Sequence, residues 1–89
     1  MVYLQIRINV LSPKISEVDA VCHKVRQDNY HIDAVVTLTS TCYQIVATRL
    51  INPHDEIQER EVTKQKYPKI KDTDMIVLTK QRYVELYDF

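Results

Sequence analysis

The sequence VYLQIRINV, residues 2–10, decides the fold of this chain. Its even positions are all apolar, whereas its odd positions carry Tyr3, Gln5, Arg7 and Asn9. Successive side chains of a strand point to opposite faces, so this period of two predicts a strand with one face in the core. We expect the other face to be open to water or to a partner.

A helix is predicted directly after this strand, over residues 13–28. Ser12 is a favoured N-cap residue, and Pro13 suits the first helical position because its missing N–H would have no intrahelical partner there. Asp28-Asn29 is the expected stop, since asparagine tolerates the left-handed conformation. Between these ends, apolar residues recur at spacings of three and four and form one stripe: Ile15, Val18, Cys22 and Val25.

Residues 32–51 are rich in β-formers, and two antiparallel strands that meet near Ser40 are the simplest interpretation. One long bent strand is the alternative, because no Asn-Gly or Asp-Gly pair marks a hairpin. Farther along, Asp72-Thr73-Asp74 is a turn signal, and a short buried strand is predicted from Met75 to Leu78.

The segment between these strands is polar. Of the 21 residues from His54 to Asp74, 11 are charged, with most acids before the lysines. Asn52-Pro53 predicts a capped helix start, and the order of charges suits a helix dipole. The apolar residues there are five apart and leave no stripe, so we expect a short polar helix within 53–67, followed by an extended loop. Residues 80–87 are predicted as a last helix capped by Thr79, with an extended C-terminus as the alternative.

These elements give the order β-α-β-β-α-β in one domain over residues 1–89. Amphipathic strands and helices must bury their apolar faces against one another. The sequence therefore predicts an α+β fold of the ferredoxin-like kind, with an antiparallel sheet and helices on one face.

The chain has 89 residues and no glycine, where average usage would place roughly six. The P-loop, the G-x-G-x-x-G fingerprint and the G-x-S-x-G elbow are therefore absent, which argues against the common nucleotide-dependent enzymes and hydrolases. Turns must rely on Asn29, Asn52 and Asp72, so we expect connections wider than two-residue hairpins. Twelve basic residues balance twelve acidic ones, so no net field attracts nucleic acid or a membrane.

Cysteines and histidines do not form a recognisable site. Cys22 and Cys42 are expected as buried thiols of a cytoplasmic protein, because no secretion signal precedes them and no apolar run is long enough to span a bilayer. The histidines have no zinc-ligand spacing with the cysteines. We expect no catalytic residue, no metal and no cofactor, and a His- or metal-dependent hydrolase is the third and most remote hypothesis. The histidines are His23, His31 and His54.

The favoured hypothesis is a non-enzymatic intracellular module that binds another protein as an adaptor, inhibitor or regulatory accessory protein. A virus or phage is a speculative source, and the protein would then act in the cytoplasm of the host cell. The last seven residues hold three of the seven aromatic residues, and tyrosine is enriched at interfaces. A homodimer through a sheet edge is a further mode of contact. The candidate partner-binding residues are Tyr3, Arg7, Tyr83, Tyr87 and Phe89.

The alternative function is binding of single-stranded RNA on the open sheet face. Val2-Tyr3-Leu4 resembles the start of the RNP2 element of RNA-recognition motifs, in which an aromatic side chain stacks on a base. The glycine-rich second element of that family is missing, and the matching strand offers Tyr43 instead. Lysines of the polar segment would add phosphate contacts. The candidate nucleic-acid residues are Tyr3, Gln5, Arg7, Tyr43, Lys64 and Lys66.

Overall fold

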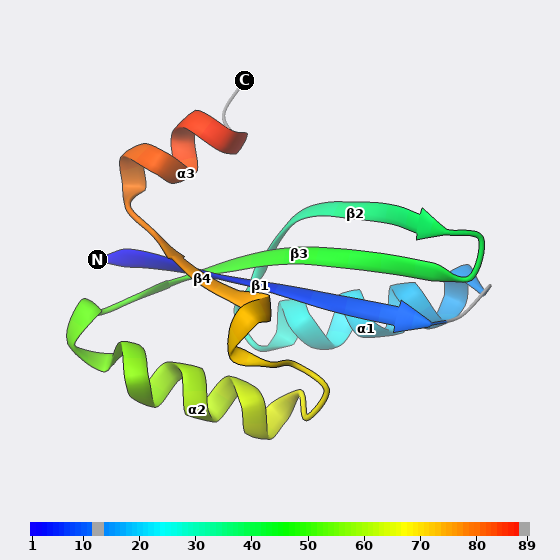
Figure 1. Ribbon diagram of the computed structural model, residues 1–89, viewed down its shortest axis with the longest axis horizontal. Coiled ribbons are helices and arrows are strands. Elements are labelled where there is room, and N and C mark those ends of the chain that lie inside the picture. The colour runs from blue at the N-terminus through cyan, green and yellow to red at the C-terminus, as the bar shows by residue number, and fades with distance from the viewer. Residues whose placement is uncertain (12–13, 88–89) are drawn as a thin grey trace.

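The computed structural model describes residues 1–11 and 14–87 and has an α+β fold, with a four-stranded antiparallel sheet and three α-helices (Figure 1). Two short 3-10 helices, η1 (Pro53–Asp55) and η2 (Asp72–Asp74), precede α2 and β4. The strands and α-helices are β1 (Val2–Leu11), α1 (Ile15–Gln27), β2 (His31–Thr39), β3 (Cys42–Ile51), α2 (Glu56–Lys66), β4 (Met75–Leu78) and α3 (Lys80–Tyr87).

Each predicted strand and helix is present, including the last helix, and most ends lie within one or two residues of the prediction. Residues 32–51 form two strands and not one bent strand. The predicted cap of α1 at Ser12-Pro13 lies outside the described residues. The cap at Asn52 is confirmed, because its side-chain oxygen accepts a hydrogen bond from the backbone N–H of His54 at 3.0 Å.

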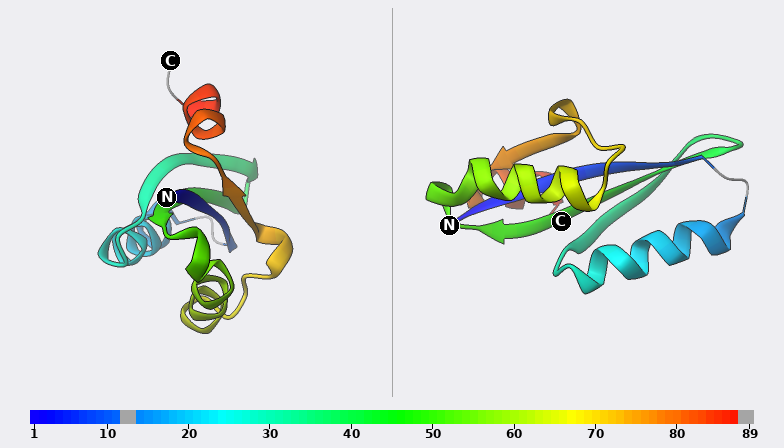
Figure 2. Two further views of the ribbon diagram at one scale, coloured as in Figure 1. Left: turned by 90° about the vertical axis from the view of Figure 1, so that its left-hand side faces the viewer. Right: turned by 90° about the horizontal axis from the view of Figure 1, so that it is seen from below.

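The sheet has the strand order β2-β3-β1-β4, and each strand pairs antiparallel with its neighbours. The even-numbered residues of β1 face the core as predicted, and Leu4 and Ile6 are fully buried. Figure 2 shows α1 and α2 on this face of the sheet and α3 on the opposite face. The prediction that the helices lie on one face therefore holds for α1 and α2 and is wrong for α3. The tyrosines of α3 contact Tyr3 and Gln5 on the polar face of β1.

The helix α1 ends just before Asn29, by the mechanism that the sequence predicts. Asn29 has φ 68°, and it is the one residue with positive φ in the described part of the chain. The backbone N–H of Tyr30 bonds to the carbonyl of Val25, and that of Asn29 bonds to Arg26, which is the Schellman pattern. The left-handed turn directs the chain from α1 into β2 without a glycine.

The hairpin between β2 and β3 is tighter than predicted. Thr39 pairs with Cys42, so only Ser40 and Thr41 connect the strands. A primed two-residue turn would need positive φ, which glycine supplies at least cost. The Thr39 hydroxyl instead accepts a hydrogen bond from the Thr41 N–H at 3.3 Å, and a bulge between Thr37 and Thr39 adjusts the adjoining strand. The prediction of wider connections is therefore wrong here.

A polar contact anchors α2 to the core. Thr63 is 2% exposed, and its hydroxyl bonds to the Glu59 carbonyl at 2.8 Å and to the Tyr30 hydroxyl at 3.1 Å. Ile57, in contrast, is 80% exposed. The absence of an apolar stripe in the sequence thus reflects a helix that packs through one buried threonine.

The C-terminal ends of α1 and α2 are joined by a second polar cluster. The Tyr67 hydroxyl donates to the Asp28 carboxylate at 2.5 Å, and Lys66 pairs with the same carboxylate at 3.5 Å. The ammonium group of Lys24 lies 4.7 Å from the centre of the Tyr67 ring. The hydrogen bond from Tyr67 is the main cause that lowers the pKa of Asp28, and it outweighs the desolvation that would raise it.

Acid should weaken the fold through Asp28. A carboxyl whose pKa is lower in the folded than in the unfolded state stabilises the fold above the unfolded value, and this contribution is lost as the pH falls through the folded value. We expect the Asp28→Asn variant to be less stable than the wild type at pH 7, with the gap closing below about pH 4. Urea unfolding between pH 7 and pH 2.5 measures the gap. The exposed-site variant Asp19→Asn is the control, and a gap that is constant over this range would contradict the assignment.

Candidate interaction site

Three tyrosines from the two ends of the chain form one cluster on the face of the sheet opposite α1 and α2. The rings of Tyr3 and Tyr83 are stacked, with centroids 4.4 Å apart and planes 15° apart. The ring of Tyr87 lies 5.3 Å from that of Tyr83. Offset stacking of this kind stabilises a contact beyond the area that it buries. The structure therefore brings together three of the five predicted partner-binding residues, but they bind one another.

Two buried polar side chains hold α3 on the sheet. The Tyr83 hydroxyl donates to the Asp33 carboxylate at 2.6 Å, and the Asp33 side chain is only 2% exposed. The Gln5 amide donates to the Tyr87 hydroxyl at 2.7 Å, and Gln5 is 1% exposed. Burial, with Asp33 as the second cause, raises the pKa of Tyr83 well above its ordinary value. Thr48 donates a further hydrogen bond to Asp33.

The prediction of an open sheet face is wrong at Tyr3 and Gln5. Because α3 folds back over this part of the sheet, Tyr3 stacks on Tyr83 and Gln5 is buried. Arg7 is exposed as predicted. Phe89, the remaining predicted partner-binding residue, lies outside the described residues. The alternation in β1 specifies which residues share a face, but whether a later segment covers that face depends on long-range packing.

The six candidate nucleic-acid residues do not form one surface. Tyr43 pairs with Val10, so it lies on the core face of the sheet, opposite to Tyr3, and packs against the core. Lys66 is paired with Asp28 at the end of α2. An aromatic side chain can stack on a base only if its ring is uncovered, and the ring of Tyr3 already stacks on Tyr83.

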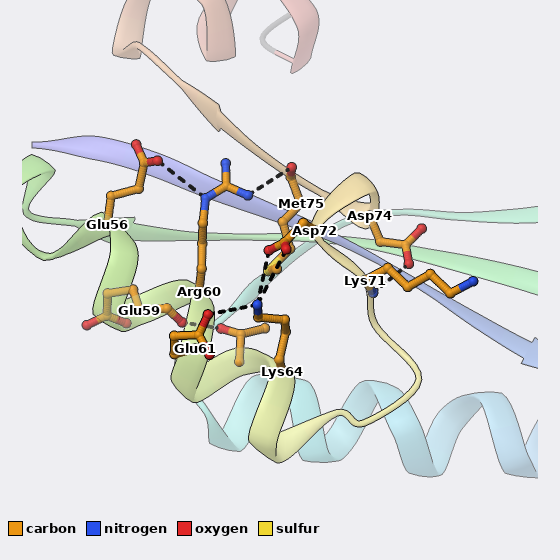
Figure 3. A network of polar contacts seen from close by, with 10 residues as sticks. Glu56, Glu59, Arg60, Glu61, Lys64, Lys71, Asp72, Asp74 and Met75 are labelled. Atoms are coloured by element: carbon orange, nitrogen blue, oxygen red, sulfur yellow. Dashed lines mark hydrogen bonds and ion pairs between the residues drawn. The ribbon is translucent and has the colours of Figure 1, made fainter.

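Lys64 belongs to a network that joins α2 to η2 and the start of β4 (Figure 3). Its ammonium group pairs with Glu61 at 2.7 Å and with Asp72 at 3.3 Å. The hydrogen bond to Glu61 is the main cause that raises the pKa of Lys64. Nearby, Arg60 pairs with Glu56 at 3.3 Å and donates to the Met75 carbonyl at 3.5 Å. The charges of this segment thus serve to hold its own elements together.

The cysteines and histidines each have their own surroundings, and His31 lies 3.9 Å from the Asp33 carboxylate. Cys22 and Cys42 are free and buried, and burial raises the pKa of Cys22, which disfavours a reactive thiolate. His23 is exposed beside Gln27, with their side-chain nitrogens 3.1 Å apart. Within residues 1–11 and 14–87, no three His, Cys, Asp or Glu side chains are grouped so that they could hold a metal ion. In the same ranges, every helix is too short or too polar to cross a membrane.

The outer strand β2 exposes several apolar side chains. β2 is an edge strand, and its residues from Val35 to Thr39 are exposed. Val35 lies opposite Ile45 and Val36 opposite Gln44, so their side chains point to different faces, and both are at least 40% exposed. The sequence carries no charge between Asp33 and Arg49. Edge strands of soluble proteins are usually protected by lysine, proline or a bulge.

Two irregularities border this edge. The register of β2 against β3 shifts between Ile32 and Ala34 and again between Thr37 and Thr39. Between the shifts, Ala34–Thr37 is a regular segment, and on its outer side no backbone group of the described residues pairs with it. The sequence indicated an open sheet edge, but not which strand would lie there, because strand order depends on long-range pairing.

No protein family, curated protein or solved structure matches this chain. The function must therefore be inferred from the geometry of its own surfaces.

Proposed function

We propose that this protein is a small non-enzymatic interaction module, an adaptor, inhibitor or regulatory accessory protein, whose main contact is the outer edge of β2. The observation that carries this proposal is the uncharged segment Ala34–Thr37 at the edge of the sheet, in which Val35, Val36 and Thr37 are exposed. Another strand that pairs there would satisfy its free N–H and C=O groups and cover Val35 and Val36.

A second copy of the same chain is the partner that this edge suits best. Two β2 strands that pair antiparallel about a twofold axis would present the same segment to each other, so the contact is self-complementary. The lack of charge favours this pairing, because like charges would otherwise face each other across the axis. The sheet would become continuous over both copies, with four strands from each. In a cell, a strand of another protein would use the same edge.

We further propose that the scaffold is ferredoxin-like, extended by α3. The strand order β2-β3-β1-β4 and the position of α1 and α2 on one face support this proposal. We propose the cytoplasm as its location, on the basis of two buried free thiols, which a reducing compartment preserves.

Sedimentation equilibrium of the purified chain tests the β2 contact. We expect a concentration-dependent dimer, and we expect Val36→Lys to weaken it by about tenfold or more, equivalent to about 1.4 kcal/mol. The two lysines would lie near each other on the same face of the joined sheet, where their charges repel.

The matched control is Val84→Lys. Val84 lies on α3 and is 40% exposed, as Val36 is, so the same change there should leave the dimerisation constant within about twofold of the wild-type value. A chain that stays monomeric at millimolar concentration, or a dimer that both substitutions weaken equally, would contradict the proposed role of β2.

A further inference from the structure

The short strand β4 leaves half of β1 unpaired on one side. β3 pairs with β1 from Val2 to Leu11, whereas β4 pairs only with Tyr3–Ile6. Within the described parts of the chain, the segment Arg7–Leu11 therefore pairs with β3 alone. In an antiparallel sheet, every second residue of such a segment points its N–H and C=O away from the paired neighbour. This segment is a second free edge, on the opposite side of the sheet from β2.

A cleft of about 460 Å³ runs along this free edge. It is lined by all five residues of Arg7–Leu11, from both faces of the strand, which places the edge of the backbone in the cleft wall. Apolar side chains of β1, α1 and the loop before η2 also line the cleft: Ile8, Val10, Val21 and Ile70. Val10 and Ile70 are buried, whereas Ile8 and Val21 are partly exposed. The cleft thus combines free backbone groups with an apolar surface.

The rim of this cleft is positively charged. Four basic and two acidic side chains line it, an excess of two positive charges on a chain whose net charge is zero. Lys24 donates a hydrogen bond to the Lys66 carbonyl at 3.3 Å, and the Lys66 ammonium pairs with Asp28 at 3.5 Å. Arg7 and Lys69 are exposed, and no carboxylate of the described residues pairs with either.

We propose that this cleft binds an extended peptide segment of another protein, in which acidic and apolar residues alternate. The segment would add as a strand to Arg7–Leu11, in the row that β4 occupies farther along the sheet. Its side chains on the core face would lie beside Ile8 and Val10, where apolar groups fit. Those on the other face would lie beside Arg7, where a carboxylate fits. This proposal does not depend on the β2 dimer, because the two edges lie on opposite sides of the sheet.

Two pools of synthetic eight-residue peptides test the proposal. One pool alternates Glu with Val, Ile, Leu or Phe, and the other replaces each Glu by Lys. We expect an NMR titration to show at least tenfold tighter binding of the acidic pool, with the largest amide shifts in Arg7–Leu11. We also expect amide hydrogen exchange to slow at alternate residues of that segment, which binding through side chains alone would not cause.

Charge reversal on the rim provides the variant test. The double variant Arg7→Glu/Lys69→Glu should weaken binding of the acidic pool at least tenfold, whereas Lys80→Glu on α3 should change it less than twofold. Equal affinity for the two pools, or no binding of the acidic pool at low salt, would overturn the proposal. Slowed exchange in β2 in place of β1 would also overturn it, because the peptide would then occupy the other edge.

Discussion

Ile45→Ala should lower the free energy of unfolding by about 2–5 kcal/mol. Ile45 is fully buried in the middle of β3, where it pairs with Ile8 on one side and Val35 on the other. Truncation would remove buried methyl groups and leave a cavity that the paired strands on both sides prevent from closing. Domains of this size are stable by only about 5–15 kcal/mol, so the loss would be a large part of the total. Urea unfolding measures it.

Ile57→Ala is the matched control, since it makes the same chemical change on the surface of α2. Ile57 is 80% exposed, and a substitution of an exposed residue should change stability by no more than about 0.5 kcal/mol. Equal losses at the two positions would mean that Ile45 is not in the core, and the assignment of the two faces of the sheet would be wrong.

Tyr83→Phe should weaken the contact between α3 and the sheet, so that α3 opens more often. The variant keeps the ring that stacks on Tyr3 but loses the hydroxyl that donates to the buried Asp33 carboxylate. A hydrogen bond to a charged group contributes about 1.5–3 kcal/mol. Because α3 is terminal and short, we expect the lost free energy to appear as more frequent local opening of this helix. Amide exchange in Lys80–Tyr87 should then be faster by roughly ten- to a hundred-fold.

Tyr43→Phe makes the same change where it should have little effect. Tyr43 is partly buried against the core, and no described residue forms a hydrogen bond with its hydroxyl. We expect exchange in α3 to stay at the wild-type rate in this variant. Unchanged exchange in Tyr83→Phe as well would show that stacking alone holds the helix.

Local patterns predicted the elements of this fold well. The alternation in residues 2–10 identified β1 and its buried face, and Asn29 and Asn52 marked a helix end and a helix start through their own side-chain and backbone preferences. These features depend on residues within a few positions of one another. For the same reason, the polar sequence of α2 indicated a helix without an apolar stripe, but not that the buried Thr63 would anchor it.

The candidate site was less predictable. The sequence identified Tyr3, Tyr83 and Tyr87 as unusual residues, but it did not indicate that they stack on one another. Nor did it show that a cleft follows the unpaired half of β1, because the cleft exists only where β4 ends and α1 and the loop before η2 approach the strand. Both features require residues from distant parts of the chain to meet.

By itself, the sequence determined which side chains share a face, where helices begin and end, and that the glycine-dependent phosphate motifs are absent. Only the tertiary structure decided which faces and edges stay exposed. The hydrogen bonds that hold α3 against the polar face of the sheet join residues 50 and 82 positions apart. No local period encodes such pairs, because they form only when the sheet has brought Gln5 and Asp33 under α3. Among the residues that the structure describes, the same long-range pairing left the edges of β2 and of Arg7–Leu11 without a neighbouring strand.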